Sequence, residues 1–128
     1  MQLTPEDHIG IQQLYARNAF AFDLGDLDAW IATWTPDGEI LSAKRGNSKG
    51  REAIRERGAP HLGVKGYHVN SNIVIDPSPE GAHCRCYMVR VLVDDEGAGQ
   101  VQVALYYEDD VVKHDGEWLF QKRVQVRQ

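Results

Sequence analysis

The first stretch of the chain carries apolar residues at the three- and four-residue spacing of an amphipathic helix. The stripe consists of Ile11, Leu14, Tyr15, Asn18 and Phe22, so it contains one amide among apolar side chains. Thr4 can cap this helix, and Pro5 suits its first position because the missing N–H needs no partner there. The pattern therefore predicts a helix that begins near Pro5 and ends at Gly25.

The next residues predict two shorter helices with a strand between them. Asp26 is a good cap for a helix through LDAWIATW (27–34), and the turn signal TPDG is expected to end it. GEILSAK (38–44) is predicted to be a short strand, and GNSKG (46–50) a polar loop. REAIRERGAPH (51–61) has helix formers for two to three turns before Gly58 and Pro60 end the helix.

From residue 66 onward the pattern changes to that of β-strands. Four runs, at residues 66–78, 82–95, 99–115 and 117–128, are separated by the hairpin-type connections PSPEG, DDEGAG and HDGE. In the third run Val101, Val103, Leu105 and Tyr107 lie opposite Gln102, Ala104, Tyr106 and Glu108. We therefore expect an α+β fold in which helices pack on one face of an antiparallel sheet, as a single domain over residues 1–128.

The charge of the chain disfavours some partners. A formal net charge of −5 argues against a nucleic acid, which is bound through clustered Lys and Arg. A basic concentration from Lys44 to Arg57 is interrupted by Glu52 and Glu56, so we interpret it as a solvated helix face or loop rather than an anion site. We find no apolar run of about 18 residues and no signal-peptide pattern, and we expect a cytoplasmic protein that contacts no membrane.

The residues with ligand chemistry are few. Cys84 and Cys86 are predicted to be reduced packing residues, because neighbours two apart on one strand rarely suit a disulfide. The acids and histidines lack metal-ligand spacing and no phosphate-binding glycine motif occurs, so we expect no metal and no cofactor. Surface or loop positions are expected for His8, His61, His83 and His114.

Asp23 and His68 are the candidates for acid–base chemistry. Asp23 closes the first predicted helix, where its charge opposes the helix dipole by about 0.3–1 kcal/mol and needs compensation. A carboxylate that accepts a hydrogen bond from an imidazole fixes the tautomer and stabilises the imidazolium that forms. On a regular strand Asn70 and Asn72 would share the face of His68, and they are open to contacts with a ligand or with the preceding loop.

Several short motifs occur in a characteristic order along the chain. They are I-x-x-L-x-x-R in the first helix, D-x-G-D at its end, TPDG, G-R-E-A-I, H-x-x-x-N at the start of the strands, and D-G-x-W before a final strand with K-R. In this order they resemble the SnoaL-like and scytalone dehydratase-like branch of the nuclear transport factor 2-like superfamily. The resemblance implies a cone-shaped curved sheet, closed by three helices, around an apolar pocket for a small molecule.

The resemblance also implies roles for individual residues. His68 matches the proton-abstracting base and Asp23 the residue that orients it. Asn18 occupies the place of a tyrosine that donates to the substrate carbonyl in several dehydratases, and Tyr15 either supplies that hydroxyl or packs in the core. Arg123 matches an arginine that faces the pocket, the alternative being a rim salt bridge with Asp109 or Asp110. Asn72 is a further candidate substrate-binding residue.

These features predict a cofactor-independent lyase of dehydratase type that acts on a small apolar or cyclic hydroxylated compound. An isomerase or a polyketide-type cyclase could use the same base. A non-catalytic ligand-binding module is the alternative from another class, because one fold hosts many functions. From the family resemblance we also expect a homo-oligomer, either a dimer or a trimer.

Overall fold

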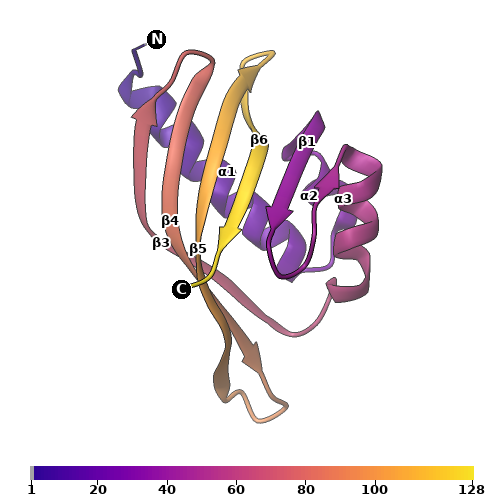
Figure 1. Ribbon diagram of the computed structural model, residues 1–128. Coiled ribbons are helices and arrows are strands. Elements are labelled where there is room, and N and C mark those ends of the chain that lie inside the picture. Colours follow the sequence, from indigo (N-terminus) through magenta and orange to yellow (C-terminus); the bar gives the residue numbers. More distant parts are fainter. Residues whose placement is uncertain (1) are drawn as a thin grey trace.

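The computed structural model describes residues 2–128, and these residues form three α-helices, a short 3₁₀ helix and a six-stranded sheet (Figure 1). The helices are α1 (Pro5–Asp23), α2 (Leu27–Ile31) and α3 (Arg51–Gly58), followed by the 3₁₀ helix Ala59–His61. The strands are β1 (Trp34–Ser42), β2 (Ser48–Lys49), β3 (Gly66–Pro77), β4 (Gly81–Val93), β5 (Gly99–His114) and β6 (Glu117–Val126). The predicted α+β class is confirmed.

The sheet has the strand order β2-β1-β6-β5-β4-β3. Strands β3 to β6 form the predicted antiparallel meander, and β2 is also antiparallel to β1. However, β1 runs parallel to β6, with Ile40 opposite Arg123 and Ser42 opposite Gln125. The expectation of a purely antiparallel sheet was therefore wrong at this pair, which joins segments from opposite ends of the sequence.

The residues TPDG do not end a helix, as the sequence predicted, but lie inside β1. Helix α2 stops at Ile31, and the backbone N–H of Phe120 donates to the Thr33 carbonyl at 2.8 Å. Pairing with β6 then begins at Trp34 and is interrupted by a bulge before Glu39. Pro36 lies within this irregular stretch, where a strand can accommodate a residue that has no N–H to donate.

Helix α1 lies across one face of the sheet and carries the predicted apolar stripe into the core (Figure 1). A capping box holds its start: Thr4 and Asp7 exchange backbone-to-side-chain hydrogen bonds of 2.9 and 3.1 Å. The bond from the Thr4 N–H, assisted by the Lys113 ammonium, lowers the pKa of Asp7 to about 2. Ile11 and Leu14 are completely buried against the sheet.

The opposite face of the sheet is open and partly apolar. The side chains of Tyr67 and Val69 on β3, Tyr87 on β4 and Val101 on β5 are exposed there. The homo-oligomer expected from the family resemblance stays a prediction. Within residues 2–128, no helix combines the length and the apolar character that crossing a membrane requires.

Candidate active site

Asp23 is the last residue of α1, and the chain turns sharply after it. The N–H of Gly25 donates to the Phe22 carbonyl and that of Asp26 to the Ala21 carbonyl. Gly25 has a φ of 80°, in the left-handed region that commonly ends helices and that glycine adopts without strain. This turn leaves the Asp23 carboxylate at the helix end, directed at β3.

The Asp23 carboxylate meets His68 at two points. Its Oδ2 accepts the backbone N–H of His68 at 2.9 Å, and its Oδ1 lies 2.6 Å from the ring Nδ1. Only 12% of the Asp23 side chain and 18% of the His68 side chain is exposed. The predicted meeting of these residues is confirmed, and the two bonds supply the compensation that a carboxylate at a helix C-terminus needs.

This contact selects the tautomer of the neutral imidazole. An ionised carboxylate can only accept, so Nδ1 carries the hydrogen and Nε2 keeps a free lone pair. The ring of Phe22 packs edge-on against the imidazole, with centroids 5.1 Å apart and planes at 78°, and so limits its rotation. A histidine held in this way can take a proton at Nε2 while the carboxylate stabilises the resulting charge.

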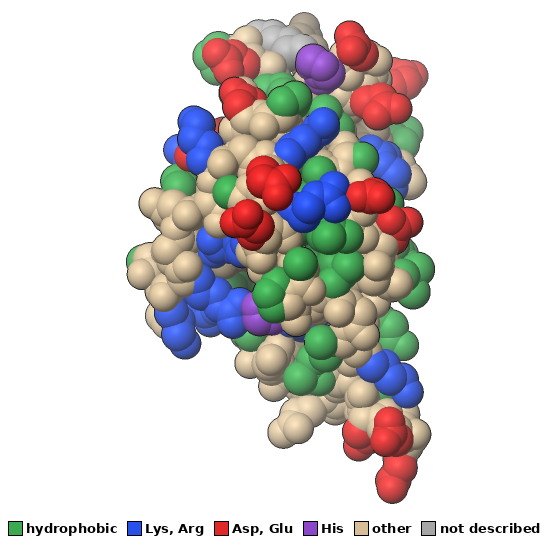
Figure 2. Space-filling model, turned by 90° about the vertical axis from the view of Figure 1, so that its right-hand side faces the viewer, with side chains coloured by type: hydrophobic (Ala, Val, Ile, Leu, Met, Phe, Trp, Pro, Cys, Tyr) green, Lys and Arg blue, Asp and Glu red, His purple; other side chains and the backbone are tan. Residues whose placement is uncertain are grey.

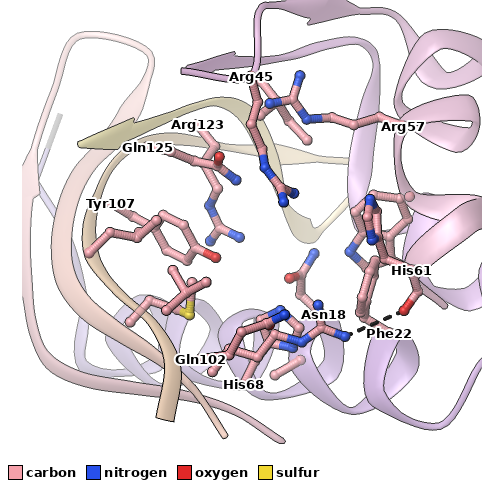
Figure 3. Close-up of a pocket in the computed structure, with 18 of the residues that line it drawn as sticks. Asn18, Phe22, Arg45, Arg57, His61, His68, Gln102, Tyr107, Arg123 and Gln125 are labelled. Carbon is pink, nitrogen blue, oxygen red and sulfur yellow. Dashed lines mark hydrogen bonds between the residues drawn. The ribbon is translucent and has the colours of Figure 1, made fainter. Parts of the chain in front are cut away.

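His68 lines a cavity between α1, α3 and the concave face of the sheet (Figure 3). The cavity encloses about 120 Å³, comparable with the roughly 150 Å³ cavity that holds benzene in an engineered protein. Its apolar wall includes Phe22, Trp30, Trp34, Met88 and Leu105. This volume is of the size that a single six-membered ring needs, and the cavity is open to solvent.

Asn18 lies on α1 five positions before Asp23 and lines the same cavity. Its Nδ2 donates to the Thr33 hydroxyl at 2.8 Å, and that hydroxyl donates to the Trp30 carbonyl at 2.6 Å. This chain of bonds fixes the amide plane. Because an amide nitrogen has two hydrogens, one donor of Asn18 is left for a ligand.

Arg123 also lines the cavity and is 5% exposed. Its Nε and Nη2 donate to the two oxygens of Asp109 at 2.9 and 3.0 Å, and its guanidinium stacks 3.7 Å from the ring centroid of Tyr107. Arg123 was predicted either to face the pocket or to form a salt bridge at the rim, and each alternative is correct in part. The residue faces the pocket, and its salt bridge with Asp109 is buried rather than at the rim.

Tyr15 does not reach the cavity. Its hydroxyl donates to Asp109, its side chain is 2% exposed, and its ring packs edge-on against Phe120. Burial and the negative charge of Asp109 raise the pKa of Tyr15 well above its ordinary value. The prediction that Tyr15 binds substrate was wrong. Tyr15 is a core residue, and its hydroxyl gives the buried Asp109 a further hydrogen bond.

Asn72 does not lie on the face of His68, because β3 is not regular. Asn72 has a φ of 57°, and the pairing of β3 with β4 shifts register between Ser71 and Val74. A bulge of this kind moves the following side chains to the other face, so that Ile73 and Ile75 point inward in the places that even-numbered residues held before it. Asn72 instead lines a separate hollow of about 390 Å³ with Tyr87 and Tyr106.

The sequence did not predict Tyr107 as a site residue, although the alternation along β5 grouped it with the apolar Val103 and Leu105. Its hydroxyl is directed into the cavity (Figure 3), and burial raises its pKa to about 12. A phenol with this pKa stays protonated at neutral pH and can donate a hydrogen bond. Tyr107 therefore brings to the cavity the hydroxyl that Tyr15 does not supply.

The basic segment lies at the surface, as expected, but part of it also borders the cavity. Arg45 is exposed in a turn, Arg57 is half-buried on α3 and His61 is exposed, and all three line the cavity. The expectation of a solvated helix face holds for Arg55, which pairs with the exposed Asp28 at 2.9 Å. The helical spacing of these residues could have separated Arg55 from Arg57, but the position of α3 against the sheet was not visible in the sequence.

The fold and this cavity define a small α+β pocket protein. The chain matches the family model of the SnoaL-like domain over residues 4–124 and belongs to the SnoaL-like family. A search of curated proteins found no match.

Solved structures share the fold over nearly the whole chain. Aln2 from a Streptomyces species has a TM-score of 0.90 at 22% identity, covering 99% of this chain and 94% of that one. A nuclear transport factor 2-like protein with a cystatin-like fold from Novosphingobium aromaticivorans has a TM-score of 0.82 at 23% identity, covering 94% and 80%. A proposed scytalone dehydratase from Novosphingobium aromaticivorans has a TM-score of 0.79 at 24% identity, covering 95% and 87%.

Proposed function

We propose that this protein is a cofactor-independent lyase of dehydratase type, acting on a small cyclic compound with a hydroxyl group β to a carbonyl. The observation that carries the proposal is the two-point contact of Asp23 with His68 at the wall of the cavity. Membership of the SnoaL-like family supports it. One structural relative is named as a proposed scytalone dehydratase, which is consistent with the same reaction class.

In this reaction His68 Nε2 removes the proton from the carbon between the carbonyl and the hydroxyl-bearing carbon. The electron pair of the C–H bond becomes an enolate, and Asp23 stabilises the imidazolium. Collapse of the enolate forms the C=C bond and breaks the C–O bond, and the imidazolium returns its proton to the departing hydroxide as water. A positioned base of this kind contributes about 10²–10⁴ in rate.

The enolate oxygen needs donors in the cavity. The free N–H of Asn18 and the hydroxyl of Tyr107 both face it, and Tyr107 stays protonated because its pKa is raised to about 12. Donors that are fixed before the reaction stabilise developing charge without reorganisation. We assign oxyanion stabilisation to these two residues, while Arg123 holds Tyr107 in place by stacking on its ring.

Turnover of a panel of cyclic β-hydroxy ketones tests the proposal, with enone formation followed by absorbance. We expect His68→Ala to lower kcat at least about 100-fold on the compounds that wild type converts. The matched control is His83→Ala, because His83 lies on the other face of the sheet and should leave kcat unchanged. Equal turnover by wild type and His68→Ala, or binding of the panel without conversion, would contradict the lyase.

A further inference from the structure

The walls of the cavity carry a charge opposite to that of the whole chain. The formal net charge of the protein is −5, yet five arginines and two histidines line the cavity and, among residues 2–128, no Asp or Glu does. The arginines are Arg45, Arg57, Arg90, Arg123 and Arg127. Figure 2 shows Lys and Arg side chains gathered beside a histidine on the face of the molecule that includes α3.

Four of these arginines have no carboxylate partner in the described part of the chain. Arg123 is neutralised by Asp109, but within residues 2–128 no Asp or Glu lies within ion-pair distance of Arg45, Arg57, Arg90 or Arg127. Arg17, Arg51 and Arg85, which do not line the cavity, have no such partner among these residues either, so the lack of a carboxylate is not what distinguishes the cavity arginines. Their distinguishing feature is that four of them border one cavity, which concentrates uncompensated positive charge there.

Arg57 is held rigidly but incompletely satisfied. Its Nη1 donates to the Gly46 carbonyl at 2.9 Å and to the Ser48 hydroxyl at 3.1 Å, which fixes the guanidinium plane. Its Nη2 is buried and has no partner among the described residues. A buried donor without an acceptor costs about 1–3 kcal/mol, and more when it is charged. Nη2 is out of reach of a water-sized group in this conformation, so an acceptor from a ligand reaches it only after a small shift of the guanidinium.

The pKa values of His61 and Arg57 are both lowered at this place. Burial, with the nearby Arg45 and Arg90, lowers the pKa of His61, and burial and Arg45 lower the pKa of Arg57. Arg90 is oriented by a long bond from its Nη2 to the His61 carbonyl, at 3.4 Å. In Figure 3 the Arg45 guanidinium points into the cavity from the side opposite His68. The positive charges of Arg45, Arg57 and Arg90 therefore lie around one cavity.

We propose that the mouth of this cavity binds an oxyanionic group of the substrate, a carboxylate or a phosphate, through Arg45 and Arg57. A bound anion would offset the repulsion among the guanidinium groups and, after a small shift of the Arg57 side chain, accept the free Nη2 hydrogen. The ring of the substrate would then lie against Trp30 and Trp34, with its reacting carbon near His68. The proposal rests on the proposed function for the reaction and extends it by naming an acidic substrate class.

Calorimetric titration with benzoate, phenyl phosphate and the neutral benzamide tests the site without requiring turnover. We expect at least one anion to bind about tenfold more tightly than benzamide, and the tighter anion identifies the group. Arg45→Gln and Arg57→Gln should each weaken anion binding about 10- to 100-fold, the range of a charged hydrogen bond. Arg55→Gln, on the same helix with the same charge change, is the matched control and should stay within about twofold of wild type.

Circular dichroism confirms the fold of each variant, and the Arg45 substitution in an exposed turn serves if the Arg57 variant does not fold. The titration of His61 followed by NMR adds a second readout: the anion, and not benzamide, should raise its midpoint. Equal affinity for benzamide and the anions, absence of binding at millimolar concentration, or an equal loss in Arg55→Gln would overturn the proposal. Anion binding that persists in His68→Ala without turnover by wild type would refute the lyase alone.

Discussion

One carboxylate, that of Asp23, holds both the ring and the backbone of His68. The 2.6 Å contact with Nδ1 fixes the tautomer, and the 2.9 Å bond from the backbone N–H fixes where β3 passes the end of α1. These two contacts hold the end of α1 against β3, although Asp23 and His68 are 45 positions apart in the chain. The same residue thus positions the imidazole and sets its chemistry.

Replacing Asp23 by Asn should uncouple these roles. The amide can still accept the backbone N–H of His68, but it cannot stabilise an imidazolium by its charge. We expect kcat to fall about 10²- to 10⁴-fold with the fold retained. NMR of the ¹⁵N-labelled imidazole reports the tautomer directly: with the amide oxygen on the backbone N–H, the amide NH₂ of Asp23→Asn faces Nδ1, so the Nε2–H form should replace the Nδ1–H form of wild type. An unchanged tautomer together with unchanged kcat would show that Asp23 is structural.

Breaking the buried pair of Asp109 and Arg123 should lower the free energy of unfolding more than replacing both residues. Asp109 is fully buried and also accepts from Tyr15, so Asp109→Ala leaves a desolvated guanidinium and an unpartnered phenol. Breaking a buried pair typically costs about 3–5 kcal/mol, whereas replacing both partners by apolar residues costs much less. Urea unfolding should therefore show that Asp109→Leu with Arg123→Met is more stable than Asp109→Ala. The reverse order would mean that the ion pair itself stabilises the fold.

Stability should depend on pH through His83 on the outer face of the sheet. Its ring bonds to Asp110 at 2.8 Å and to Glu108 at 2.6 Å, and the bond to Asp110 is the main cause that raises the pKa of His83. A raised folded-state pKa contributes stability below the unfolded value of about 6.5, and this contribution is lost as pH rises through the folded value. In urea unfolding, the free energy of unfolding of wild type should exceed that of His83→Gln by the largest amount below pH ~6.5. A difference that grows with pH would have the wrong sign.

Gly58 ends α3 where Trp30 forms the cavity wall. A Cβ at this position would lie 2.4 Å from Cζ3 and 2.8 Å from Cη2 of Trp30, so the indole must move. We expect Gly58→Ala to destabilise the fold by about 1–3 kcal/mol. The control is the same change in a Trp30→Phe background, which removes both clashing atoms. If the two penalties measured by thermal unfolding are equal, the contact with Trp30 is not the cause.

The sequence was sufficient for the features that depend on local patterns or on the ordered motifs. Thr4, Pro5 and Gly25 bound α1 as predicted, and the family resemblance brought Asp23 and His68 together. Three features depend on contacts between distant segments. The start of β1 is set by pairing with the C-terminal strand, the place of Asn72 by a bulge against β4, and the direction of Arg57 by how α3 packs on the sheet.

The most direct test of His68 as the base is deuterium exchange in D₂O, followed by NMR, at the carbon next to the carbonyl of a ring ketone without a leaving hydroxyl. Cyclohexanone and 4-oxocyclohexane carboxylate give neutral and anionic versions of the probe. Wild type should accelerate exchange of at least one of them, and His68→Ala should exchange at least about 100-fold more slowly. Exchange that is equal in wild type and His68→Ala, or no faster than in buffer for both probes, would contradict proton abstraction by His68.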